Sequence, residues 1–233
     1  MMRTLTATAL VALLAAAPAM AETRTFDMAA FDGIEVSSGL DLTFEVGPAQ
    51  SVTVEHTGDD WDRFEIDVSG GVLELGRRSS GIMNWGRRPG FKVTVTAPEI
   101  HTLKVSSGAD AEGRGMSGEQ VVISVSSGAD AEVTGIEAGG VELSSSSGAD
   151  LTASGTCESL EASSSSGSDI NAEDLICRFV EADASSGSDI EVHATESVEA
   201  EASSGADIEV SGSPVNVSTD KSSGGSVDVD RVN

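Results

Sequence analysis

Apolar and polar residues alternate along the second half of the chain, on both sides of a short phrase that recurs every 18 to 20 residues. The phrase is Ser-Ser-Gly followed by Ala or Ser and then Asp, and its last copy is degraded. The glycines of its seven copies are Gly108, Gly128, Gly148, Gly167, Gly187, Gly205 and Gly224. Around Gly148, for example, Val141, Leu143, Leu151 and Ala153 are apolar, and the residue within each pair is polar. Period-two alternation is typical of β-strands with one buried face, so each copy is predicted to be a bend between two strands.

Coils of this constant length suit a parallel β-helix, in which equivalent residues of successive coils stack ~4.8 Å apart. The residues beside each bend are Ala, Ser or Gly, which indicates a narrow interior. A run of antiparallel hairpins is the alternative, but both the bend and the apolar positions repeat in register, which favours the coil. We therefore predict an all-β protein, a parallel β-solenoid of about seven coils of ~20 residues each.

Residues 22–100 are less regular and hold most of the large apolar side chains. Alternation predicts strands over residues 31–36, 40–46, 52–56, 64–68, 72–75 and 91–96. Residues 69–71, Ser-Gly-Gly, are the predicted turn of a hairpin. Residues 37–41 repeat the phrase of the coils and predict an early coil, with residues 47–100 looping out before the next one. This segment is predicted to cap one end of the solenoid, where an open edge would invite pairing with other chains. Residues 22–100 and 101–233 would then pack as one domain.

Residues 1–21 have the features of a signal peptide. Arg3 precedes an apolar run over residues 5–17, and residues 19–21, Ala-Met-Ala, have the small-x-small pattern of a cleavage site. The run is too short to span a bilayer, and no later stretch approaches 18 apolar residues. We expect an exported protein of the periplasm or the extracellular space, with no transmembrane segment in the mature chain.

Composition and charge limit the partners that the chain can bind. Its 233 residues include 13 Lys and Arg against 39 Asp and Glu, a net charge of −26. This balance argues against nucleic-acid binding, which needs cationic side chains to displace the counterions of phosphate. Aromatic residues make up only 3 % of the chain, so a core of interlocking rings is excluded.

The order of motifs in the chain resembles the head GIN domain family of auto-transporter adhesins. The resemblance rests on residues 31–36, 52–54, 71–75 and 93–100, followed by the Ser-Gly-Ala-Asp coils, and it covers residues 26–230. It implies an exported, β-helical bacterial protein. It carries over no catalytic residue, because the family has no established activity. We therefore expect a non-catalytic, adhesin-like interaction module of the cell envelope, with an unidentified envelope or surface partner and no cofactor unless calcium is one.

Candidate catalytic residues do not form a recognisable set. His56, His101 and His193 are scattered, without the Cys or carboxylate spacing of a zinc site. No serine has the strand–nucleophile–helix context of a hydrolase, and the acidic residues repeat along the coils instead of converging. We predict that the protein is not an enzyme.

The repeated aspartates are the first candidate site. Asp110, Asp130, Asp150, Asp169, Asp189 and Asp207 occupy the same position in successive coils and are predicted to stack in one row, the Asp ladder. Like charges ~5 Å apart repel unless cations or hydrogen bonds intervene. Two interpretations remain open. Either the carboxylates accept hydrogen bonds from the bends and face water, or neighbouring carboxylates and carbonyls bind calcium in a structural, cation-dependent solenoid.

A basic stretch is the second candidate site. Arg77, Arg78, Arg87 and Arg88 bracket Trp85 in an otherwise acidic chain. Guanidinium groups around an aromatic ring suit an anionic or phosphorylated glycan. The alternative is a solvated hairpin tip, whose arginines prevent edge-to-edge aggregation.

Cys157 and Cys177 are the only cysteines, and each lies ten residues before the glycine of its coil. Stacking would place their Cα atoms about 5 Å apart, within the range that a disulfide accepts. Because an exported protein meets an oxidising compartment, we predict a disulfide that contributes roughly 3 kcal/mol to stability. The alternative is a pair of buried free thiols that fill the core.

Overall fold

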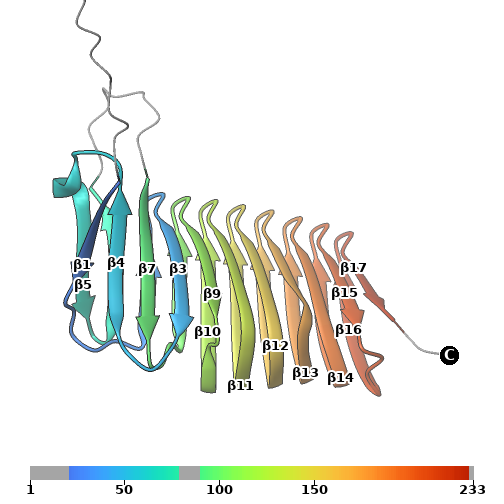
Figure 1. Cartoon of the computed structure of the whole chain (residues 1–233). Coiled ribbons are helices and arrows are strands. Elements are labelled where there is room, and N and C mark those ends of the chain that lie inside the picture. Colours follow the sequence, from blue (N-terminus) through green and yellow to red (C-terminus); the bar gives the residue numbers. More distant parts are fainter. Residues whose placement is uncertain (1–20, 79–89, 231–233) are drawn as a thin grey trace, which may run out of the picture.

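The computed structural model describes residues 21–78 and 90–230, which form β-strands and one short 3-10 turn, Trp61–Arg63 (Figure 1). The strands of the N-terminal part are β1 (Glu22–Phe26), β2 (Gly33–Val36), β3 (Asp41–Val46), β4 (Ser51–His56), β5 (Phe64–Ser69), β6 (Val72–Arg77) and β7 (Phe91–Ala97). The first strands of the repeats are β8 (Thr102–Ser106), β9 (Asp110–Arg114), β10 (Ser117–Ser126), β11 (Asp130–Ser146) and β12 (Asp150–Ser165). The remaining strands are β13 (Asp169–Ser185), β14 (Asp189–Ser203), β15 (Asp207–Ser211), β16 (Asn216–Ser222) and β17 (Ser226–Val229).

The chain reverses at each Ser-Ser-Gly bend because two consecutive residues adopt the left-handed conformation. Between β11 and β12, φ is +61° at Ser147 and +68° at Gly148. In the bend between β8 and β9, the Ala109 amide donates a hydrogen bond of 3.3 Å to the Ser106 carbonyl. Positive φ at both central residues and this i to i+3 bond are features of a type I′ turn. The same pair of left-handed residues occurs at 38–39, 107–108, 127–128, 166–167, 186–187, 204–205 and 223–224.

Two walls enclose the interior of the solenoid. Wall A consists of the strands that lead into the bends: β2, β8, β10, the C-terminal halves of β11 to β14, and β16. Wall B consists of the strands that leave them: β3, β9, the N-terminal halves of β11 to β14, β15 and β17. Successive coils pair in parallel and in register, with shifts at the edge opposite the bends, for example between Val133 and Ile136. The predicted parallel β-solenoid is therefore confirmed, and the alternative that the repeats form antiparallel hairpins is excluded.

Beside the bends of the repeats, the side chains that point into the interior are small, namely Ala, Val or Ser. Ser145 and Ser164 are buried there, and each hydroxyl donates a hydrogen bond of 2.7 Å, to the carbonyls of Ala149 and Ser168 respectively. Buried hydroxyls are tolerated when they are hydrogen-bonded in this way. Farther from the bends, larger aliphatic side chains such as Ile123, Leu143 and Leu151 are fully buried between the walls, and among residues 101–230 no buried side chain is aromatic.

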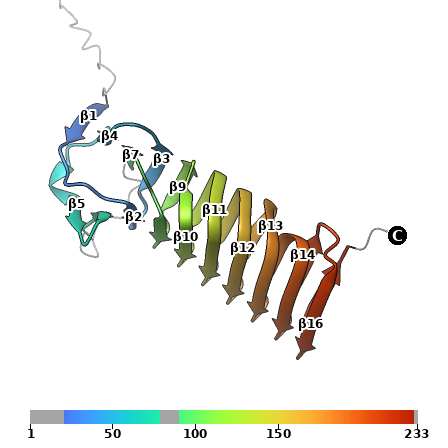
Figure 2. The ribbon, with the colours of Figure 1, turned by 90° about the horizontal axis from the view of Figure 1, so that it is seen from below.

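The N-terminal part supplies the first coil and then closes the end of the solenoid. β2 pairs with β8 and β3 pairs with β9, so the predicted early coil at residues 37–41 is confirmed. Wall A continues through β6 and β5, and wall B continues through β7, β4 and β1. These extensions curl toward each other (Figure 2), and the rings of Phe26 in β1 and Phe64 in β5 lie 5.7 Å apart. The large aromatic side chains thus fill the cap that the sequence predicts.

The bend geometry predicts opposite effects of two neighbouring substitutions. Ser147→Asn should raise the free energy of unfolding by about 0.5 kcal/mol, because Asn adopts the left-handed conformation more readily than Ser. Gly148→Ala should lower it by about 1–2 kcal/mol, because a Cβ disfavours the positive φ. Steric contact adds little at Gly148, since the nearest atom to an added Cβ is the Gly167 carbonyl oxygen at 3.9 Å. Urea denaturation measures both effects, and equal stability of all three proteins would contradict the turn assignment.

Candidate functional site

The six aspartates of the predicted ladder lie in register on wall B, and their side chains are exposed beside the bends. Asp41 of β3 pairs with Asp110 and extends the row by one residue. Sequence reasoning left Asp41 out of the ladder, although residues 37–41 repeat the phrase of the coils. The reason is that β4 to β7 separate it from the next coil along the chain. The row therefore contains seven carboxylates on seven successive coils.

The ladder is electrostatically unfavourable. Partial burial raises the pKa of Asp110, Asp150 and Asp189, and the carboxylates of the neighbouring coils raise it further. Stacking gives each coil one such carboxylate, whereas calcium prefers six to eight oxygen ligands around one point. Among residues 21–78 and 90–230, no three His, Cys, Asp or Glu side chains are grouped so that they could hold a metal ion. Calcium binding at the ladder stays a prediction.

Of the predicted anion site, the structure describes only the two arginines at its start. Arg77 ends β6, and Arg78 follows it with its Nε atom 2.7 Å from Glu65 Oε1. The Arg78 carbonyl accepts a hydrogen bond of 2.6 Å from Arg63. Trp85, Arg87 and Arg88 lie outside the described residues. The glycan or anion site therefore also stays a prediction.

The predicted disulfide is confirmed. Cys157 of β12 and Cys177 of β13 are register partners on wall A, their Cα atoms lie 4.6 Å apart, and the two residues are bonded. Cys177 is fully buried and Cys157 is almost so. The bond therefore ties two neighbouring coils together near the edge opposite the bends.

The three histidines lie in different places and have local partners. His56 is buried in the cap, where its ring stacks on Phe91 at 3.8 Å and its Nε2 atom lies 2.8 Å from Asp60 Oδ1. His101 Nδ1 lies 2.8 Å from the Ser117 carbonyl oxygen, and His193 Nδ1 lies 3.0 Å from Ser211 Oγ. His56 also lowers the pKa of Asp60 through that hydrogen bond. Of the three, His56 is buried in the aromatic cluster of the cap, whereas His101 and His193 are partly exposed and have local hydrogen-bond partners.

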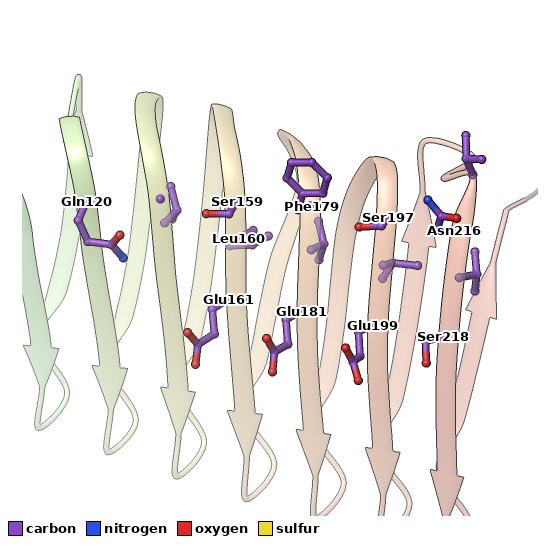
Figure 3. A pocket seen from close by; sticks show the side chains of 16 residues that line it. Gln120, Ser159, Leu160, Glu161, Phe179, Glu181, Ser197, Glu199, Asn216 and Ser218 are labelled. Carbon is purple, nitrogen blue, oxygen red and sulfur yellow. The ribbon is translucent and has the colours of Figure 1, made fainter.

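A groove of about 740 Å³ on wall A is the site that sequence reasoning missed. It crosses β10 to β14 and β16, and three rows of side chains follow it along the solenoid (Figure 3). The row nearest the edge opposite the bends contains Gln120, Gly140, Ser159, Phe179, Ser197 and Asn216. The middle row contains Val141, Leu160, Val180, Val198 and Val217, of which the first four are buried and form the floor of the groove. The third row contains Glu161, Glu181, Glu199 and Ser218, and Glu142 continues it beyond the groove.

Phe179 distinguishes this groove from the rest of the repeats. It is the only aromatic residue after Phe91 in the sequence, which is the signal that could have drawn attention to it. Its flanking neighbours in the same row are Ser159 and Ser197, so the ring stands above small side chains and is 38 % exposed. Val215, beside the groove, is 84 % exposed. The groove thus combines exposed apolar groups with a row of carboxylates.

Arg178 lies over Phe179, with its guanidinium 5.0 Å from the ring centroid. The same guanidinium pairs with Glu158 at 2.5 Å and with Glu196 at 2.7 Å, which raises the pKa of Arg178 and lowers that of Glu196. Glu181, in contrast, has its pKa raised by partial burial and by the surrounding acids. One arginine is therefore bound between two carboxylates and a ring at the margin of the groove, whereas the carboxylates inside it repel one another.

The comparisons with known proteins agree with this architecture. Residues 30–214 match the family described as "Putative auto-transporter adhesin, head GIN domain". The chain belongs to this family. No curated protein matches it. In residues 21–78 and 90–230, no helix has the length and apolar character needed to cross a membrane.

Several crystal structures share the fold of this head GIN domain protein at low sequence identity. A "putative adhesin" from Bacteroides fragilis NCTC 9343 is 18 % identical, with a TM-score of 0.82 over 91 % of this chain and 97 % of that one. A second, from Parabacteroides merdae ATCC 43184, is 14 % identical, with a TM-score of 0.71 over 92 % and 98 %. A "putative lipid binding protein" from Parabacteroides distasonis ATCC 8503 is 18 % identical, with a TM-score of 0.67 over 91 % and 97 %. At these identities the likeness establishes the fold alone.

The raised pKa values of the ladder predict a pH-dependent gain in stability when one carboxylate is removed. The folded protein holds these protons more tightly than the unfolded chain does, so the free energy of unfolding falls as the pH rises through the raised pKa values. Asp150→Asn should therefore raise the free energy of unfolding at pH 7 and low salt by about 0.5 kcal/mol. The gain should vanish below about pH 3.5, where the wild-type carboxyl is protonated in both states.

Urea denaturation at both pH values checks this expectation. Asp27→Asn is the matched control, because Asp27 is an exposed acid in the segment between β1 and β2, away from the ladder. An equal gain for both variants, or a gain at Asp150 that persists at low pH, would show that repulsion within the ladder is not the cause.

Proposed function

We propose that this protein is an exported, non-catalytic interaction module of the cell envelope that adheres to a partner through the groove of wall A. The observation that carries the proposal is the exposure of Phe179 and Val215 beside a row of carboxylates on a rigid β-wall. Isolated exposed apolar residues are common, but apolar groups gathered in a groove with a polar rim are typical of an interaction site. Membership of a family named for adhesins supports the same function.

The architecture suits binding better than catalysis. Parallel pairing holds equivalent side chains at ~4.8 Å intervals, so a long surface is preorganised without loops that must be ordered on binding. The acidic residues lie in rows, and each of the three histidines has a local hydrogen-bond partner. The disulfide between Cys157 and Cys177 supports export to an oxidising compartment, either the periplasm or the cell exterior.

Binding of the mature protein to intact envelopes tests this function. Fluorescently labelled protein should bind isolated envelopes and whole cells saturably, and Phe179→Ser should reduce the affinity at least about fivefold. The matched control is Glu132→Gln on wall B, which should bind as the wild type does. Envelope binding that is absent, or that is the same for Phe179→Ser and the wild type, would contradict the proposal.

A calcium-dependent structural solenoid is the second candidate, because cations at the Asp ladder would offset the repulsion between its seven carboxylates. Each coil offers one ladder carboxylate, so we expect cations to act there by screening rather than by coordination. Calcium and magnesium at equal ionic strength should then raise the melting temperature equally. A rise of several degrees that calcium alone produces and a chelator reverses would favour the second candidate instead.

A further inference from the structure

Arg178, next to Phe179 at the margin of the wall A groove, shows a contact that a guanidinium group makes with this surface. The Arg178 guanidinium lies over the ring of Phe179 and between the carboxylates of Glu158 and Glu196. A planar guanidinium suits both contacts, because it stacks on an aromatic face and pairs with carboxylates through a fork of N–H groups. Arg178 occupies one margin of the groove only.

The carboxylates inside the groove lack such a partner. Glu161, Glu181 and Glu199 lie in one line on the outer surface of wall A (Figure 3), in register on three successive coils. Among the ion pairs formed within residues 21–78 and 90–230, none involves these three residues. Their surroundings include the acids of the next row, Asp183 and Glu201. A cationic ligand would therefore relieve repulsion here and gain three ion pairs.

From these contacts we propose that the groove binds an extended, arginine-bearing peptide segment of another protein, which lies along the solenoid axis with its guanidinium groups on the glutamate row. The proposal rests on the function proposed above and names the chemical class of the partner. The exposed part of the Phe179 ring, two residues from Glu181 on the same face of β13, would stack with the arginine that pairs with Glu181. Val215 would contact the apolar parts of the segment, and Gln120 and Asn216 would offer hydrogen bonds at the two ends of the groove.

The spacing of a β-strand agrees with this mode of binding. Alternate side chains of an extended peptide lie on one face about 6.7 Å apart, so three arginines at alternate positions span about 13 Å. The three glutamates that line the groove, Glu161 to Glu199, cover two steps between coils, or about 10 Å, and Glu142 beyond the groove extends this line to about 14 Å. Three guanidinium groups thus match the length of the row, and lysine would reach the same carboxylates without stacking on Phe179.

Isothermal titration calorimetry of the mature protein at low salt tests the proposal. The probe is a capped heptapeptide that alternates serine and arginine, compared with versions that carry lysine or citrulline in place of arginine. We expect saturable binding of the arginine peptide, binding about threefold to tenfold weaker for the lysine peptide, and none for the uncharged citrulline peptide.

Three variants locate the binding site. Glu181→Gln should weaken the arginine peptide about tenfold, because it removes the central carboxylate. Phe179→Ser should weaken it about fivefold and abolish the preference for arginine over lysine. Serine occupies the equivalent position in both flanking coils, at Ser159 and Ser197, so the fold accommodates this change. Glu132→Gln on wall B changes the net charge as Glu181→Gln does and should bind within about twofold of the wild type.

Equal weakening by Glu181→Gln and Glu132→Gln would overturn the proposal, because the peptide would then respond to the net charge and not to the groove. Failure of the arginine peptide to bind would overturn it as well. If envelope binding still depends on Phe179 in that case, the interaction function stands and only the partner class is wrong.

Sedimentation of the free protein tests whether the groove binds a second copy of the chain. Self-association that Phe179→Ser and Glu181→Gln abolish, together with the absence of peptide binding, would assign the groove to a second copy instead.

Discussion

The left-handed Ser-Gly bend is the element on which the rest of the structure depends. Each bend reverses the chain within two residues, and all the bends stand at the same edge of the solenoid (Figure 1). Neighbouring bends also hydrogen-bond along the axis, for example from the Ser127 amide to the Ser146 carbonyl. This fixed reversal sets the register of every coil, so that residues at equivalent positions of the repeat become neighbours in space. If the register shifted by one residue, the apolar side chains would move from the interior to the surface.

The parallel register of the coils has favourable and unfavourable consequences, because it places the residues at each repeated position next to one another. It brings Cys157 and Cys177 together for a disulfide, and it brings the buried Ser188 hydroxyl within 2.9 Å of the Ser164 carbonyl oxygen of the preceding coil, to which it donates a hydrogen bond. It also stacks like charges in the Asp ladder and in the glutamate row of the groove, where burial and repulsion raise the pKa of several carboxyls. The fold tolerates this repulsion on solvent-exposed rows. The same rows concentrate negative charge on the surface. A cationic or uncharged partner can therefore contact this surface more favourably than an anionic partner can.

The cap covers the N-terminal end of the solenoid, which would otherwise be open. A solenoid exposes unpaired strand edges and core side chains at its first coil. Here both walls continue past β2 and β3 and curl until β1 and β5 meet through Phe26 and Phe64. The buried ring of His56 between Phe91 and Trp61 adds to this aromatic cluster. Aromatic side chains are thus concentrated in the cap, whereas the core of the repeats is built mainly from aliphatic side chains.

The sequence by itself determined the all-β solenoid, the bends, the early coil at residues 37–41 and the pairing of Cys157 with Cys177. Each of these depends on a period or an alternation that runs along the chain, and such patterns are visible without knowing which distant residues meet. Only the tertiary structure decided that Asp41 joins the Asp ladder, that Phe26 contacts Phe64, and that Phe179 lines a groove beside the glutamate row. These features depend on the lateral contacts and relative sizes of side chains from separate coils. A groove forms where a large side chain lies between small side chains of the neighbouring strands. Its shape therefore exists only after the coils have stacked.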